Sequence, residues 1–196
     1  MLKKMMILML GCWVLFGESL PTFYDFEDEN LTIWYRNALW EVDEDKSSMV
    51  LALKRPSLHS PFNLCYTDKV LLGDGNVSVL FRADQGREDQ GGGIMWRVQD
   101  ANNYYVIRFN PLENNFRFYL VANGNRTMIA SADMKLQGGW HEIKISHVGD
   151  HLMGYLDGHR LIDTRDNQLP DAGGVGVWTK ADALTSFDNL LIEQAH

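Results

Sequence analysis

Short runs of alternating apolar and polar residues cover most of this chain. The clearest are residues 94–99 and 104–110, which are separated by a polar turn over residues 100–103. Side chains on a strand point alternately to the two faces of a sheet. Each run therefore has an apolar face, which in the first run carries Trp96 and Val98, and a second face that carries an arginine. A sheet with one face on a core and the other on water or a ligand is typical of antiparallel structure.

The same pattern predicts about twelve or thirteen short strands and no long helix. Turn signals such as Asn123-Gly124 recur about every 8–12 residues. Residues 31–40 are left unassigned, and residues 43–46 are interpreted as an acidic turn. The expected strands span residues 23–26, 39–42, 49–53, 77–82, 94–99, 104–110, 116–121, 128–130, 140–146, 152–156, 160–163, 173–179 and 186–192. The sequence thus predicts one all-β domain, an antiparallel sandwich or barrel.

The chain opens with a basic segment and an apolar run of about a dozen residues, Met5 to Phe16. This run has the length of a signal-peptide core and is shorter than the ~20 residues that span a bilayer. Small residues before the expected cleavage after Ser19 make residues 1–19 a signal peptide and residues 20–196 the mature domain. A lipoprotein signal ending at Cys12 is an alternative, but the apolar run continues past that cysteine. We therefore expect a periplasmic or extracellular protein with no membrane span after signal removal.

Signal removal would leave an acidic chain with one cysteine. It would delete two of the 18 basic and one of the 26 acidic side chains, which gives a net charge of −9 with histidine neutral. This sign disfavours nucleic acids and anionic membrane surfaces as partners, because both need basic patches. Cys65 would have no partner for an internal disulfide. Its apolar neighbours predict a buried structural thiol rather than a nucleophile.

Several arginines lie on the predicted strand faces that point away from the core. If their strands are neighbours, they form a polar stripe across one sheet. Planar guanidinium groups and aromatic rims suit sugar hydroxyls or a carboxylate, and pairing with Asp and Glu on a wet face is the structural alternative. Trp178 and Lys180 share one strand face, where the indole could stack on a sugar ring. The candidate ligand-binding residues are Arg82, Arg97, Gln99, Tyr104, Arg108, Asn110, Arg117, Tyr119, Trp178 and Lys180.

The histidines do not have the spacing of a zinc site. His147 and His151 flank a turn, so we interpret them as surface residues. No cofactor is expected, although loop carboxylates could hold calcium. The candidates for such a calcium site are Asp25, Asp182 and Asp188.

Longer motifs resemble one group of exported bacterial proteins. They include Gly-Gly-Ile-x-Trp-Arg-x-Gln-Asp-x-x-Asn-Tyr-Tyr-x-x-Arg at residues 92–108, Gly-x-x-Gly-x-Trp-Thr-Lys-Ala-Asp at residues 173–182 and Phe-Asp-Asn-Leu at residues 187–190. Together they are similar to concanavalin A-like (laminin-G-like) jelly rolls, closest to the group named for 3-keto-disaccharide hydrolase domains. The resemblance implies a two-sheet jelly roll over roughly residues 23–192 and sugars as the ligand class. This fold also hosts lectins and plain interaction modules, so the chemistry stays open.

Family-16 glycosidases carry paired carboxylates on one strand, because retaining chemistry needs carboxyl groups about 5 Å apart. The nearest match here, Glu41-Val42-Asp43-Glu44-Asp45, ends in aspartate and lies near the N-terminus, which argues against that mechanism. We favour an exported carbohydrate-binding or interaction module. The alternatives are an enzyme acting on 3-keto-glycosides, with Glu113, His141 or Asp182 as the base, and a structural domain of a cell-surface assembly.

Overall fold

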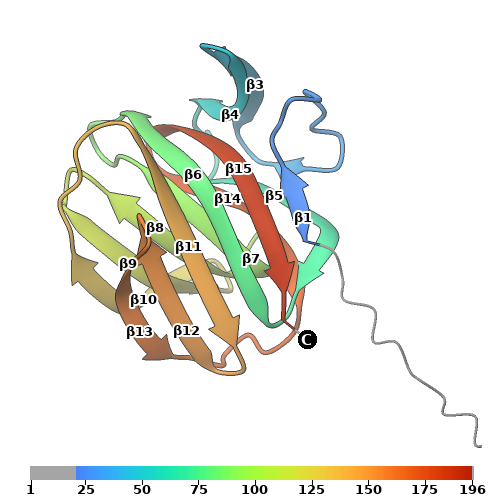
Figure 1. The fold of residues 1–196 in the computed structure, drawn as a ribbon, viewed down its shortest axis with the longest axis vertical. Helices are drawn as coiled ribbons and strands as arrows, with labels where there is room; N and C mark the ends of the chain where they lie inside the picture. The colour runs from blue at the N-terminus through green and yellow to red at the C-terminus, as the bar shows by residue number, and fades with distance from the viewer. Residues whose placement is uncertain (1–20, 196) are drawn as a thin grey trace, which may run out of the picture.

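Strands make up all of the regular structure in residues 21–195, the part of the chain that this computed structural model describes (Figure 1). Within that range, no helix is long and apolar enough to cross a membrane. The predicted signal peptide and the alternative at Cys12 lie outside the described residues. The strands are β1 (Thr22–Tyr24), β2 (Tyr35–Arg36), β3 (Leu39–Asp45), β4 (Ser48–Arg55), β5 (Phe62–Leu72), β6 (Gly75–Gln85), β7 (Gly92–Asp100), β8 (Asn103–Asn110), β9 (Asn115–Ala122), β10 (Asn125–Asp133), β11 (Trp140–Val148), β12 (His151–Leu156), β13 (His159–Arg165), β14 (Gly173–Lys180) and β15 (Leu184–Gln194).

These strands form two antiparallel sheets. The eight-stranded sheet has the order β13-β12-β11-β6-β15-β4-β3, with β1 also paired to β15. The seven-stranded sheet has the order β10-β9-β8-β7-β14-β5-β2. Figure 1 shows them as two layers, with β11, β6 and β15 of the larger sheet in front. The predicted all-β, two-sheet antiparallel sandwich is confirmed.

The core lies between the two sheets and takes one face of each strand. Trp96 and Phe109 of the seven-stranded sheet pack there with Phe81 and Ile143 of the other sheet, all of them buried. Trp96 is thus a core residue, as the alternation predicts. Cys65 is in the same cluster, and burial raises the pKa of its thiol far above the ordinary value. The predicted burial of this thiol is confirmed.

His147 also lies in the core, so its predicted surface position was wrong. It is fully buried, and its Nδ1 accepts a hydrogen bond from Trp96 Nε1 at 3.0 Å. Strand β11 continues to Val148, so the alternation that buries Ile143 and Ile145 buries residue 147 as well. Burial, followed by the charge of Arg97, lowers the pKa of His147 to about 4.

A β-bulge near Arg97 changes the faces of the last part of β7. Arg97 has a φ of 47°, and the pairing register with β8 shifts between Trp96 and Asp100. Val98 therefore packs with Met95 on the outer face of the sheet and not with Trp96 in the core. The predicted apolar face of this strand holds for its first half and fails after the bulge.

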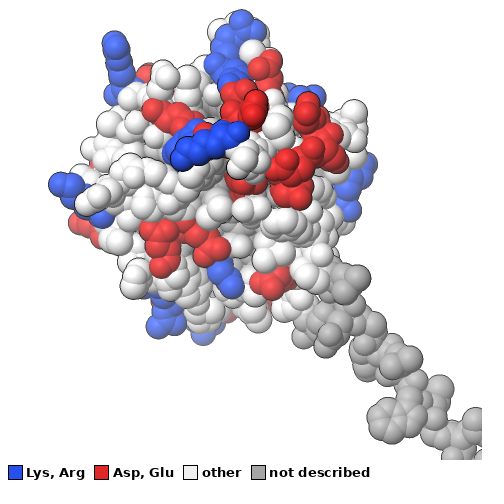
Figure 2. All heavy atoms as spheres, turned by 45° about the horizontal axis from the view of Figure 1, so that its top comes forward, with Lys and Arg blue, Asp and Glu red and all other residues white. Residues whose placement is uncertain are grey.

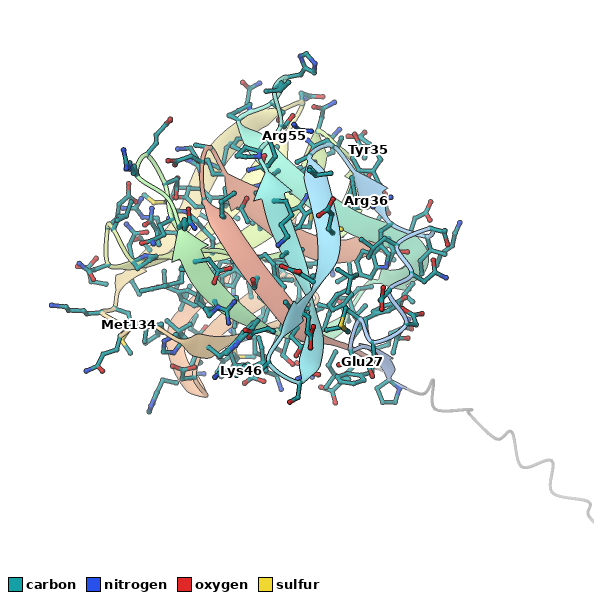
Figure 3. The ribbon with its side chains drawn as sticks, turned by 90° about the horizontal axis from the view of Figure 1, so that it is seen from above. Glu27, Tyr35, Arg36, Lys46, Arg55 and Met134 are labelled. Atoms are coloured by element: carbon teal, nitrogen blue, oxygen red, sulfur yellow. The ribbon has the colours of Figure 1, made fainter. Side chains whose placement is uncertain are left out.

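The acidic segment at residues 43–46 is mostly strand, which corrects the predicted turn. Strand β3 runs to Asp45, which pairs with Ser48, and only Lys46 and Ser47 form the turn. Lys46 has a φ of 62°, as tight hairpin turns require. Figure 3 looks onto this β3–β4 hairpin, with Lys46 near its turn and Arg55 toward its other end.

Candidate functional site

The outer face of the seven-stranded sheet is concave. Trp178 on β14 donates from Nε1 to the Tyr104 hydroxyl on β8 at 3.2 Å, across the intervening β7. The Arg126 guanidinium on β10 lies 5.7 Å from the ring centroid of Phe62 on β5, although four strands separate β10 from β5. In a flat sheet those two strands would be about 24 Å apart, at about 4.8 Å per strand. The sheet must therefore curve strongly toward its outer side.

Aromatic and aliphatic side chains line the floor of this concave face. They are buried although they point away from the core between the sheets. Strand β14 carries a glycine on this face, at residue 176, where no larger residue fits. A Cβ at Gly176 would lie 2.1 Å from the Cys65 carbonyl oxygen. The buried members are Leu64, Met95, Val98, Tyr104, Val106, Tyr119, Val121 and Trp178, with Phe62 and Tyr66 packed against them.

Three arginines converge on Tyr119 at one end of this floor. Arg108 Nη2 and Arg117 Nη1 donate to the Tyr119 hydroxyl at 3.5 and 3.4 Å. The Arg126 guanidinium stacks over the same ring, 4.3 Å from its centroid, and is 5.8 Å from the centroid of Trp178. Arg126 thus covers the aromatic floor by cation–π contact.

Two carboxylates pair with part of this positive charge. Glu113 Oε2 accepts hydrogen bonds from Asn115 at 2.8 Å and from Arg108 and Arg117 at 3.2 Å each. The Asn115 bond first, and then the Arg108 bond, lower the pKa of Glu113. The second carboxylate belongs to Asp89.

Asp89 joins the loop before β7 to this cluster. It is buried and accepts hydrogen bonds from Asn110 Nδ2 at 2.8 Å and from Lys180 Nζ at 3.1 Å. Arg108 Nη1 is 3.8 Å from Asp89, which is an ion-pair distance but too long for a hydrogen bond. The carboxylate therefore compensates Arg108 only in part.

Several guanidinium nitrogens of this cluster have no hydrogen-bond acceptor among the described residues. They are Nε and Nη1 of Arg108 and Nη1 of Arg126, and all three atoms are buried. The Arg108 side chain is only 3% exposed. A buried donor without an acceptor costs about 1–3 kcal/mol, so these nitrogens mark where oxygens from a ligand would be stabilising.

Some predicted site residues do not belong to the concave face. Arg82 lies on β6 of the other sheet, where it pairs with Asp45 at 2.6 Å and stacks on Trp140. Arg97, turned by the bulge, bonds to Asp74 at 2.9 Å and to two loop carbonyls. The prediction of one stripe of four arginines is wrong for Arg82, because β6 belongs to the other sheet. It is wrong for Arg97 because the bulge turns that side chain away from Arg108 and Arg117.

Gln99 belongs to that displaced group as well. Its amide nitrogen donates to the carbonyl oxygens of Asp171 and Ala172 at 3.2 and 3.3 Å, so it fastens a loop beyond the bulge.

Trp178 is fully buried and forms the floor, so it is not the exposed stacking platform that its strand position predicts. The predicted residues that the structure brings together are Tyr104, Arg108, Asn110, Arg117, Tyr119, Trp178 and Lys180.

The sequence reasoning missed Arg126 and Asp89. Arg126 could have been found, because the two-residue turn Asn123-Gly124 sets it opposite Val121, on the face that also carries Tyr119. Asp89 gives no such signal. It lies in a polar loop whose path depends on the contacts between distant strands.

Glu113, His141 and Asp182, the three candidate catalytic bases, do not form one cluster. His141 borders a hollow of about 210 Å³ together with Phe81 and Phe109, and its Nδ1 is 2.7 Å from Asp157. Asp182 borders a separate, open hollow of about 520 Å³. Its carboxylate accepts the backbone N–H groups of residues 87–89, and these bonds lower its pKa. Neither is in hydrogen-bond contact with Glu113.

Among residues 21–195, no group of three or more His, Cys, Asp and Glu side chains is arranged to hold a metal ion. Asp182 is occupied with the loop N–H groups described above. Burial raises the pKa of Asp188, and the charges of Glu27 and Asp25 add to that effect.

The carboxylates of residues 41–45 do not belong to the sheet that forms the concave face. They are on β3, the edge strand of the larger sheet, where Asp43 pairs with Lys54 and Asp45 with Arg82. Figure 2 brings the end of the molecule with β3 and β4 forward and shows acidic groups with Lys and Arg side chains beside them. This part of the surface carries charges of both signs, and its Asp43 and Asp45 carboxylates are already paired.

Comparison with solved structures identifies the fold. Similar chains include a carbohydrate binding module, CBM66, from Bacillus subtilis, with a TM-score of 0.70 and 22% identity over 84% of this chain and 97% of that one. A β-glucanase from Bacillus licheniformis has a TM-score of 0.62 and 14% identity over 90% of this chain and 98% of that one. A scan of family models and a search of curated proteins found no match. At these identities the likeness establishes the jelly-roll sandwich.

Proposed function

We propose that this protein is an exported, non-catalytic module that binds carbohydrate on the concave face of its seven-stranded sheet. The observation that carries the proposal is that Arg108 and Arg126 have buried guanidinium N–H donors without acceptors, which lie beside an aromatic floor. Sugar hydroxyls accept such hydrogen bonds, and sugar C–H faces pack on aromatic rings. The likeness to a carbohydrate binding module supports the same choice. Export rests on the signal peptide predicted at residues 1–19.

The accessible rim of the cluster would contact the ligand first. Glu113 and Arg117 have side chains that are 50% and 30% exposed, and they are joined by an ion pair at 3.2 Å. Such a pair presents both acceptors and donors to the hydroxyls of one sugar. The buried members Asp89, Asn110 and Arg108 hold this rim in place.

Affinity electrophoresis through gels that contain neutral or acidic polysaccharides tests the proposal. We expect retardation by at least one polysaccharide, and we expect Arg117→Ala to weaken it about tenfold, as loss of a charge-assisted bond of about 1.4 kcal/mol requires. Arg82→Ala, on the other sheet, is the matched control and leaves retardation unchanged. Free migration through every gel at high protein concentration would refute the proposal.

Catalysis on 3-keto-glycosides has weaker support. It needs a base beside an oxyanion site, whereas Glu113, His141 and Asp182 lie in separate places. The pKa values of Glu113 and Asp182 are lowered, so both carboxylates are poorer bases than usual. Incubation with a 3-keto-glucoside is the direct test, and turnover that is abolished in Glu113→Gln would replace the binding proposal with an enzymatic one.

A further inference from the structure

The concave cluster carries more positive charge than its own acids compensate. Its cations are Arg108, Arg117, Arg126 and Lys180, and the acids that pair with them are Asp89 and Glu113. This excess of two positive charges stands in a protein whose overall charge is −8. Surface cations of an acidic protein usually find acidic partners, so a local excess around an aromatic floor calls for a physical reason.

Arg126 is the cation without an acid. Among residues 21–195, no carboxylate lies within 4.0 Å of its guanidinium, and its contacts are with the rings of Tyr119, Phe62 and Trp178. Burial lowers the pKa of Arg126, and the like charge of Arg108 adds to the lowering. A half-buried guanidinium beside another one gains from any anion that reaches both.

Arg108 supplies the second half of an anion site. Its guanidinium is 5.8 Å from the centroid of the Tyr119 ring, over which Arg126 also lies. Nε and Nη1 have no hydrogen-bond acceptor, whereas Nη2 donates to Glu113 and Tyr119. Because Nη1 lies cis to Cδ, the Nε–H and Nη1–H bonds are not parallel, so each of these nitrogens can donate one charge-assisted hydrogen bond to an oxyanion.

Arg126 is also the part of the site that can move. It is held by cation–π contacts, which are weak at a partly exposed site, and it makes no ion pair with the described residues. Its strand β10 is the edge strand of the sheet, so its side chain can swing outward without disturbing a neighbouring strand. The swing would uncover the Tyr119 ring and the free Arg108 donors together.

We propose that the concave face is specific for acidic sugars and that Arg108 and Arg126 bind the oxyanion of one sugar residue, a uronate carboxylate or a sulfate ester, while the sugar ring packs on the Tyr119 ring that Arg126 uncovers. This inference rests on the proposed function, because it names the ligand class of the same site. It assigns Arg126 as the specificity-determining residue, with Arg108 as the fixed, buried half of the anion site.

The test compares each acidic polymer with its neutral counterpart. Titration calorimetry at low salt would measure binding of the purified protein to polygalacturonate and to the same polymer after reduction of its carboxyl groups to alcohols. A sulfated glycan and its desulfated form provide the second pair and distinguish the two oxyanions. We expect at least one acidic polymer to bind about tenfold or more tightly than its neutral form, and we expect that advantage to shrink as salt rises.

Variants of Arg126 tie the preference to the site. Arg126→Gln keeps a long polar side chain without the charge and should remove most of the preference for acid, about tenfold in affinity. Arg126→Lys should keep a part of it, because a lysine supplies the charge but not the fork. Arg160→Ala, an exposed arginine on β13 of the other sheet, is the charge-matched control and should change nothing.

The outcomes separate this inference from the function beneath it. Equal binding of the acidic and neutral forms, or an unchanged preference in Arg126→Gln, overturns the acidic-sugar assignment and leaves carbohydrate binding in place. No binding to any glycan overturns both. Thermal unfolding of each variant confirms that a loss of binding is not a loss of fold.

Discussion

Acidification should lower the free energy of unfolding, because the folded protein buries one neutral histidine. His147 is fully buried and accepts the Trp96 indole hydrogen bond on Nδ1, which requires a ring without a proton at that atom. Its pKa of about 4 in the folded protein lies below the 6.5 of a free histidine. Below pH 6.5 the unfolded chain therefore takes up a proton that the folded protein refuses, and stability falls as the pH drops toward 4.

The size of this effect follows from the two pKa values. Between pH 7 and pH 5, proton binding to the unfolded state alone is worth about 2 kcal/mol from this one residue, by linkage. The full shift corresponds to about 3 kcal/mol once the pH is below 4. Either value is a large share of the 5–15 kcal/mol that stabilises a typical domain.

Urea unfolding at pH 7 and pH 5 measures the loss. Carboxylates also titrate in this range, so the informative quantity is the difference between the wild type and His147→Asn, whose amide oxygen can accept the Trp96 bond without titrating. We expect the variant to be less stable at pH 7 and to lose about 2 kcal/mol less than the wild type on acidification. The exposed His159→Asn serves as the control. Equal losses in the wild type and His147→Asn would refute the assignment of a neutral, buried imidazole.

Three further outcomes follow from the packing. Gly176→Ala should cost about 2–3 kcal/mol or more in the free energy of unfolding, because its Cβ would meet the Cys65 carbonyl at 2.1 Å, whereas Gly138→Ala, with no atom within 4 Å, should be near neutral in the same urea titration. The Cys65 thiol should react with a maleimide only as fast as the native protein opens, and rapid labelling at pH 7, located by peptide mass mapping, would contradict its burial. Arg82→Ala should lower the free energy of unfolding by no more than about 1 kcal/mol, since the ion pairs of Arg82 are partly exposed. A loss clearly above about 1 kcal/mol in thermal unfolding would contradict this prediction.

The fold could be predicted because strand alternation is a local property. Each side chain on a strand points opposite to its neighbour, so the apolar faces of β7, β8 and β11 are visible in the order of residues alone. The prediction fails where backbone geometry breaks the period. The bulge at Arg97 is such a place, since nothing in residues 94–100 marks the extra residue before the strand meets its partner.

The candidate site depended on facts that the sequence does not contain. Alternation assigns Arg82 and Arg108 to similar outward faces, but only the tertiary structure decides that β6 and β8 belong to different sheets, so that the two arginines lie on opposite sides of the sandwich. Only the curvature of the seven-stranded sheet brings Arg126 over Trp178 and Phe62. The sequence by itself thus determined which residues face outward, because that is set by each strand alone. Which of them meet was decided by sheet membership and curvature, because these arise from pairing between residues that are far apart in the chain.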